Sequence, residues 1–244
     1  YMIITTPQSS LIQVSRISAS TFGYGNAGDI TLKVDNLVIR DGSRIATVSF
    51  AGGNGGDLTV TAAESVEIAG FSSDLIFSGL YSIADIESTG NAGNLNINTK
   101  QINVRDRGRI SVGNFGSDNT GNLNVNADNI FLDNQASLQA FTNTGSQGNI
   151  NLNSKFIQLR RNSNIATDAG ETANGGNINI NSLVIAGFEN SDIIANAVEG
   201  NGGNINITTS GIFGLEFRDE LTEESDITAS SQFGVNGTVE INNI

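Results

Sequence analysis

Short runs of alternating apolar and polar residues recur along the chain. In the run 29–34, the apolar residues Ile30 and Leu32 alternate with the polar residues Thr31 and Lys33. Alternation with a period of two predicts a β-strand that has one face in a core and the other in solvent. We find no helical periodicity in these runs, so the pattern predicts an all-β protein.

The alternating runs belong to a repeat that begins with glycine. The copy at residues 148–154 reads GNINLNS, and related copies begin at seven other glycines. These are Gly28, Gly56, Gly93, Gly121, Gly176, Gly203 and Gly237. The successive intervals are 28, 37, 28, 27, 28, 27 and 34 residues, which is typical of a solenoid. We interpret each repeat glycine as the corner before the first strand of a coil.

The coil at residues 28–55 serves as the template for the others. It contains three short alternating runs, at 29–34, 37–40 and 44–48, with the turn signal Asp41-Gly42 before the third. No coil can bury its apolar face alone, so neighbouring coils must stack. The repeat therefore predicts a right-handed, single-stranded parallel β-helix of about eight to nine coils of ~28 residues, with three short strands in each. We expect one domain over residues 1–244, with partial first and last coils.

Asparagine fills an outward position of the first strand in five successive coils. The column consists of Asn96, Asn124, Asn151, Asn179 and Asn206. Asparagine is a poor strand former, but amides stacked in register can hydrogen-bond to one another along the axis. One interpretation is a solvated ladder that keeps a flat sheet soluble. The other is a regular array that binds a glycan or ordered water.

Two coils are longer than the rest, with insertions at residues 70–82 and 214–225. Both insertions follow the second predicted strand, so they should protrude from the same edge, about five rungs apart. Within the first, either Leu80 or Ile83 could supply the inward residue of the third strand. Loops that project from a rigid scaffold often carry function. The candidate binding residues in these loops are Phe71, Asp74, Phe77, Tyr81, Arg218, Asp219, Glu220, Glu223 and Glu224.

The charge of the chain excludes some classes of partner. The net charge is −13 and there is no basic cluster, which argues against nucleic acid and anionic membranes. No run approaches the ~20 apolar residues of a membrane helix. The chain has no cysteine, so disulfides and thiolate metal sites are excluded.

No catalytic, cofactor or metal site is predicted. The acidic run near Glu223 lacks the D-x-D-x-D-G spacing of a calcium loop. Asp29 and Asp57 would stack on each other, but asparagine replaces them in later coils, which indicates a turn preference rather than catalysis. The chain contains no histidine. Many parallel β-helices are polysaccharide lyases or glycoside hydrolases, so an enzyme of this kind is retained as the alternative. Its site would need two or three carboxylates converging on one face.

The repeats GNAGDITL, GNGGDLTV and GNAGNLNI and the closing segment ESDITASSQFGVNGTVEIN carry a resemblance to a known family. From about residue 10 onward, the chain resembles the filamentous-haemagglutinin-like exoproteins of two-partner secretion, especially the cyanobacterial ones. The resemblance implies a right-handed β-helix and a full-length protein exported through an outer-membrane β-barrel transporter. The NPN-type motifs of the family's secretion domain are absent, which implies a rod segment rather than the export signal.

These observations together predict a structural role. We expect a secreted or bacterial cell-surface rod that binds a glycan or a cell-surface receptor through its flat faces or its two loops. The rod could also associate with copies of itself, end to end or face to face. We expect no enzymatic activity.

Overall fold

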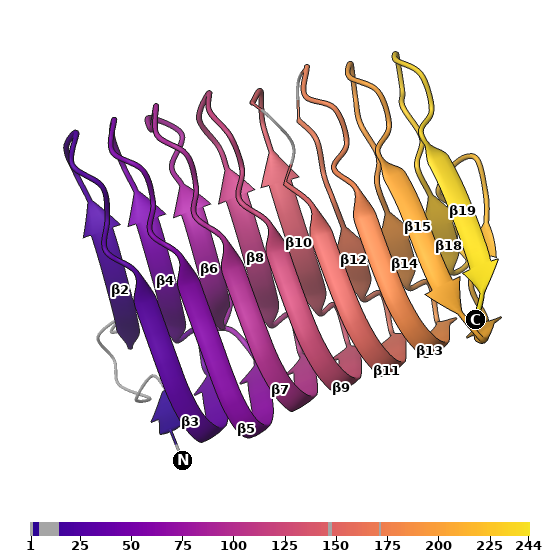
Figure 1. Cartoon of the computed structure of the whole chain (residues 1–244), viewed down its shortest axis with the longest axis horizontal. Helices are drawn as coiled ribbons and strands as arrows, with labels where there is room; N and C mark the ends of the chain where they lie inside the picture. Colours follow the sequence, from indigo (N-terminus) through magenta and orange to yellow (C-terminus); the bar gives the residue numbers. More distant parts are fainter. Residues whose placement is uncertain (1, 5–14, 146–147, 171) are drawn as a thin grey trace.

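The computed structural model describes residues 2–4, 15–145, 148–170 and 172–244 as a parallel β-solenoid. Sheet A contains β1 (Met2–Ile4), β3 (Ile30–Arg40), β5 (Leu58–Ala69), β7 (Leu95–Arg105), β9 (Leu123–Asp133), β11 (Ile150–Arg160), β13 (Ile178–Phe188), β15 (Asn204–Thr209), β16 (Gly211–Phe213) and β19 (Thr238–Asn243). Sheet B contains β2 (Arg16–Thr21), β4 (Arg44–Ser49), β6 (Gly79–Ala84), β8 (Arg109–Asn114), β10 (Ser137–Thr142), β12 (Asn164–Ala166), β14 (Asp192–Ile194), β17 (Glu216–Phe217) and β18 (Asp226–Thr228). Figure 1 shows the strands following one another along the molecule.

Each turn from β3–β4 to β13–β14 consists of one strand of sheet A followed by one strand of sheet B, so the prediction of three strands per coil is wrong. In the last complete turn each sheet contributes two short strands, β15 and β16 followed by β17 and β18. The first and second predicted strands are one long strand, because the hydrogen-bonded ladder continues through the bend between them. In β11, pairing with β13 is present on both sides of Lys155. The inward residues Leu152 and Ile157 lie five positions apart, so the alternation changes phase at this bend. In the sequence, that change of phase interrupts the alternation of apolar and polar residues, so the pattern predicts two short strands in place of one long strand.

The predicted number of coils is also too high. The described residues form seven complete turns, from the β3–β4 turn to the turn that starts at β15 and ends at β18. Partial turns flank them, and the last repeat glycine, Gly237, precedes β19 alone. Counting repeat glycines therefore overestimates the complete turns. The stacking of parallel strands is as predicted.

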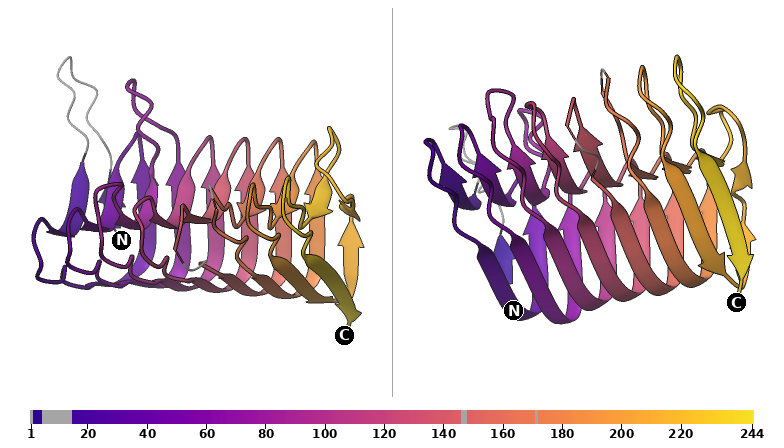
Figure 2. Two further views of the ribbon diagram at one scale, coloured as in Figure 1. Left: turned by 90° about the horizontal axis from the view of Figure 1, so that it is seen from above. Right: turned by 45° about the horizontal axis from the view of Figure 1, so that its top comes forward.

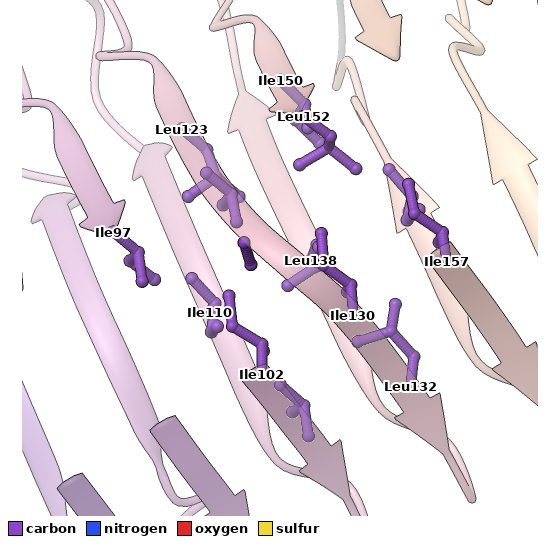
Figure 3. Close-up of a cluster of buried hydrophobic side chains, with 14 of the residues drawn as sticks. Ile97, Ile102, Ile110, Leu123, Ile130, Leu132, Leu138, Ile150, Leu152 and Ile157 are labelled. Atoms are coloured by element: carbon purple, nitrogen blue, oxygen red, sulfur yellow. The ribbon is translucent and has the colours of Figure 1, made fainter. Parts of the chain in front are cut away.

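The core consists of in-register columns of aliphatic side chains. In one column, Leu123 of β9 pairs with Leu95 and Ile150 of the flanking turns, and all three side chains are fully buried. Figure 3 shows the side chains of three such columns packed between the sheets. The pairing register also decides whether Leu80 or Ile83 is the inward residue of β6. Leu80 pairs with Ile45 and is fully buried, whereas Ile83 packs against a separate cluster that includes Tyr81.

The two ends of each turn are built differently. Outside the two longer coils, sheet A leads into sheet B through tight turns with two successive left-handed residues, such as Asp106-Arg107 and Asn134-Gln135. Their backbone groups continue the ladder, since the Arg107 N–H donates to the Asn134 carbonyl at 3.0 Å. Sheet B returns to sheet A through longer arms, which line up along the upper edge in Figure 1.

The repeat glycines lie in these arms, where one turn contacts the next. A Cβ atom on Gly121 would lie 2.0 Å from the carbonyl oxygen of Gly93, and a Cβ on Gly93 would lie 2.1 Å from that of Gly56. The φ angles of these glycines are not in the left-handed region. Except at Gly28, where a Cβ would have nothing within 4 Å, the repeat glycines are therefore required for close backbone contact between turns, rather than for a corner conformation as we expected from the sequence.

Both insertions follow the part of sheet A that corresponds to the second predicted strand. The first is shorter than expected, because its last four residues belong to β6 and the loop covers residues 70–78. It projects beyond the neighbouring turns in the left view of Figure 2. The second covers residues 214–225 and contains β17.

Candidate functional site

The predicted asparagine column forms a continuous ladder on the outer face of sheet A. The Nδ2 group of each residue donates to the Oδ1 atom of the residue one turn earlier. The distances are 2.9 Å from Asn124 to Asn96, 2.9 Å from Asn151 to Asn124, 2.9 Å from Asn179 to Asn151 and 3.1 Å from Asn206 to Asn179. Each inner amide therefore keeps one N–H and part of its oxygen for other partners.

A second rank of asparagines runs beside the first, two residues further along each strand. It is bonded less continuously: Asn126 donates to Asn98 at 3.1 Å, and Asn181 donates to Asn153 at 3.4 Å. A shallow groove of about 430 Å³ lies between the two ranks, from β9 to β15. The groove is neutral, and its walls are amides whose bonding capacity is partly used within the ladders.

Removing the middle of the ladder should destabilise the fold modestly. We expect Asn151→Ala to lower the free energy of unfolding by about 1–2 kcal/mol, because the residue takes part in two ladder bonds, each contributing about 0.5–1.5 kcal/mol. Asn153→Ala removes only the long bond from Asn181 and is the matched control. Urea unfolding measures both. Equal losses for the two variants would contradict a stabilising role of the first ladder.

The loop at residues 70–78 packs against two arginine side chains. Phe71 and Phe77 form an isolated antiparallel bridge, and their ring centroids lie 6.2 Å apart. The guanidinium of Arg107 lies 5.2 Å from the Phe71 ring centroid, and that of Arg109 lies 3.9 Å from the Phe77 centroid. The positive charges thus contact the aromatic rings. The cation–π contacts fix the loop and leave less ring surface for a ligand.

Tyr81 lies in β6, beneath this loop, and is only 6% exposed. Its hydroxyl donates to the Phe77 carbonyl at 3.1 Å, and Arg44 lies 5.0 Å from its ring centroid. Burial raises the pKa of Tyr81 to about 12, although the positive charges of Arg44 and Arg109 oppose the shift. Tyr81 therefore supports the loop, while Asp74 is exposed at its surface.

The loop at 214–225 is fixed through Arg218. Its guanidinium forms an ion pair with the carboxylate of Asp226, a fully buried residue at the start of β18. The carboxylate of Asp226 also accepts a hydrogen bond of 2.6 Å from the Thr222 backbone. Arg218 further pairs with Glu216 at 3.0 Å and lies 3.9 Å from Glu224. The predicted binding residue Arg218 is thus engaged in holding the loop.

Asp219 and Glu220, in contrast, face a concave space beside the loop. This cavity of about 480 Å³ lies between residues 219–221 and the arm after β18. It is lined by Asn196, Ala197, Asp219, Glu220, Leu221, Ser230, Ser231, Gln232 and Asn236. We call it the arm cavity. Glu223 and Glu224 are exposed in the same loop and do not line it.

Sequence reasoning missed the arm residues of this cavity. Asn196 and Asn236 lie 40 positions apart and resemble the many other asparagines of the repeat. They meet because the arms of successive turns stack and the loop at 214–225 folds over them. No signal in the sequence distinguishes them from asparagines of other arms.

Asp168 gives the fold a testable pH dependence. Burial raises the pKa of its carboxyl, and the hydrogen bond of 3.0 Å from Gln139 lowers it by less. The stability that the folded protein gains from protonated Asp168 is therefore fully present below the pKa of about 3.9 in the unfolded chain. It is lost as the pH rises through the higher pKa of Asp168 in the folded protein. We expect Asp168→Asn to raise the free energy of unfolding at pH 7 relative to wild type. Urea unfolding from pH 4 to pH 7 should show this advantage shrinking towards acid pH. A constant difference would contradict it.

Within the described residues, no group of three or more histidine, cysteine, aspartate or glutamate side chains is arranged to hold a metal ion. The same part of the chain contains no helix of the length and apolarity needed to cross a membrane. The fold places the protein in the class of parallel β-solenoids. Comparison with protein-family models, with curated proteins and with solved structures gives no match.

Proposed function

We propose that the chain is a structural and adhesive rod, a right-handed β-helix segment of a secreted or cell-surface exoprotein. The observation that carries the proposal is the in-register stack of seven turns, with fully buried aliphatic columns along its length. Each turn is bonded to its neighbours on both sides, so the stack resists bending and separates its ends. Such a scaffold suits the presentation of binding loops at a distance from an anchoring surface.

The similarity to filamentous-haemagglutinin-like exoproteins supports the same proposal. It adds export of the full-length protein through an outer-membrane transporter, and a glycan or surface receptor as the ligand. The net charge of −13 is consistent with a partner that is not nucleic acid.

Adhesion can be tested with beads that carry the purified chain. We expect these beads to be retained under flow on surfaces coated with bacterial or plant polysaccharides, and beads carrying albumin to be washed away. Retention no greater than that of the albumin beads on every coating would contradict adhesion. The same polysaccharides, incubated with the free chain and analysed for shortened products, test the alternative of a lyase or hydrolase.

A further inference from the structure

The arm cavity is a depression open to solvent, and its lining includes exposed polar groups that are available to a ligand. Its volume of about 480 Å³ is within the ~300–1,000 Å³ typical of small-molecule sites. Within the described part of the chain, Asp219 and Glu220 are exposed to solvent, and their carboxylates form no ion pair and accept no hydrogen bond. The side-chain amide of Gln232, on the facing arm, is likewise without a partner there.

The walls of the cavity are held in place by the fold. The Oδ1 atom of Asn196 accepts a hydrogen bond of 2.7 Å from the Ser230 backbone, and that of Asn236 accepts one of 2.8 Å from the Ser231 backbone. These bonds orient both amides and leave their NH₂ groups as donors. On the opposite wall, the clamp between Arg218 and Asp226 holds the loop that carries the carboxylates.

Another groove on the rod has its charges already paired. It lies over the C-terminal halves of the strands of sheet A. Glu67 in its wall accepts hydrogen bonds from Arg40 at 2.7 Å and from Arg105 at 3.0 Å. Arg160 in the same groove pairs with Glu189 at 3.1 Å. Fixed donors and free carboxylates therefore distinguish the arm cavity from this groove.

Carboxylates beside amide donors match the chemistry of a sugar. A hydroxyl group can donate to a carboxylate and at the same time accept from an amide N–H, and neighbouring hydroxyls can repeat this pattern. The partly exposed side chain of Leu221 offers an apolar contact for the C–H groups of a sugar ring. No basic side chain lines the cavity, so the two negative charges disfavour uronates and sulfated sugars.

We propose that the arm cavity binds a neutral saccharide, with Asp219 and Glu220 accepting hydrogen bonds from its hydroxyl groups. This inference rests on the proposed adhesive function and names the class of ligand. The site lies at the edge of the rod, where a terminal sugar of a surface polysaccharide can enter.

A glycan array tests the proposal directly. The probes are immobilised neutral hexoses and N-acetylhexosamines, cationic amino sugars, uronates and sulfated sugars. We expect wild type to bind at least one neutral probe, and Asp219→Asn/Glu220→Gln to bind it at least about tenfold more weakly, a change of ~1.4 kcal/mol. Glu223→Gln/Glu224→Gln removes the same charge from the same loop outside the cavity. This matched control should bind within about twofold of wild type.

Each other result overturns the assignment. Unchanged binding by the cavity variant, equal losses in both variants, binding confined to cationic or acidic sugars, or no binding to neutral probes would all do so. The bead assay separates this failure from failure of the adhesive function. If beads carrying wild type and beads carrying the cavity variant are retained equally, the adhesive function is supported and only the assignment of the arm cavity is overturned. If beads carrying wild type are not retained, the adhesive function itself is overturned.

Discussion

Replacing Gly121 by alanine should lower the free energy of unfolding by about 1–3 kcal/mol, the range typical of an overpacked site. The added Cβ would lie 2.0 Å from the carbonyl oxygen and 2.5 Å from the carbonyl carbon of Gly93. Both atoms belong to the backbone of the preceding turn, so no side chain can rotate away. The turns must separate locally, which also strains the ladder of hydrogen bonds on either side.

Gly28→Ala is the matched control, because Gly28 opens the same repeat. A Cβ at Gly28 would have nothing within 4 Å. We expect a change of no more than about 0.5 kcal/mol for this variant, as for most surface substitutions. Urea unfolding monitored by circular dichroism measures both variants. Similar losses at the two positions would show that the glycine serves the local conformation of the arm and would contradict the close-contact explanation.

Replacing Ile130 by alanine should cost about 2–5 kcal/mol, since truncation of a large aliphatic side chain in a tight core leaves a cavity. Ile130 is fully buried and pairs with Ile102 and Ile157 in the flanking turns. Because each turn buries its apolar face against its neighbours, the loss should extend beyond β9. Hydrogen exchange should therefore become faster in β7 and β11 as well.

Asn129→Ala, one residue earlier, is the control for this experiment. Asn129 lies on the same strand but is only partly buried, and we expect a change within about 0.5 kcal/mol. Faster exchange confined to β9 in the Ile130 variant would contradict coupling between neighbouring turns. An equal loss for Asn129→Ala would show that the strand is sensitive to any substitution.

The alternating pattern and the repeat determined the all-β class, the parallel stacking and most inward positions. Ile150 and Leu152 lie in the core and Asn151 outside it because a strand has a period of two, and this holds whatever surrounds it. The same logic predicted the amide ladder of Asn124 and Asn151. Stacking identical turns in register brings equal side chains within hydrogen-bonding distance.

Only the tertiary structure decided the number of strands per turn and the inward residue of β6. It also decided which candidate binding residues are engaged in contacts within the protein and which are exposed. Leu80 is the inward residue because β6 pairs in a register that sets it against Ile45 and Ile110, and a linear pattern does not contain that register. The arm cavity joins Asn196 to Glu220 across two turns. A repeat specifies the contacts that recur in every turn through local periodicity, whereas contacts that occur once depend on the path of an irregular loop.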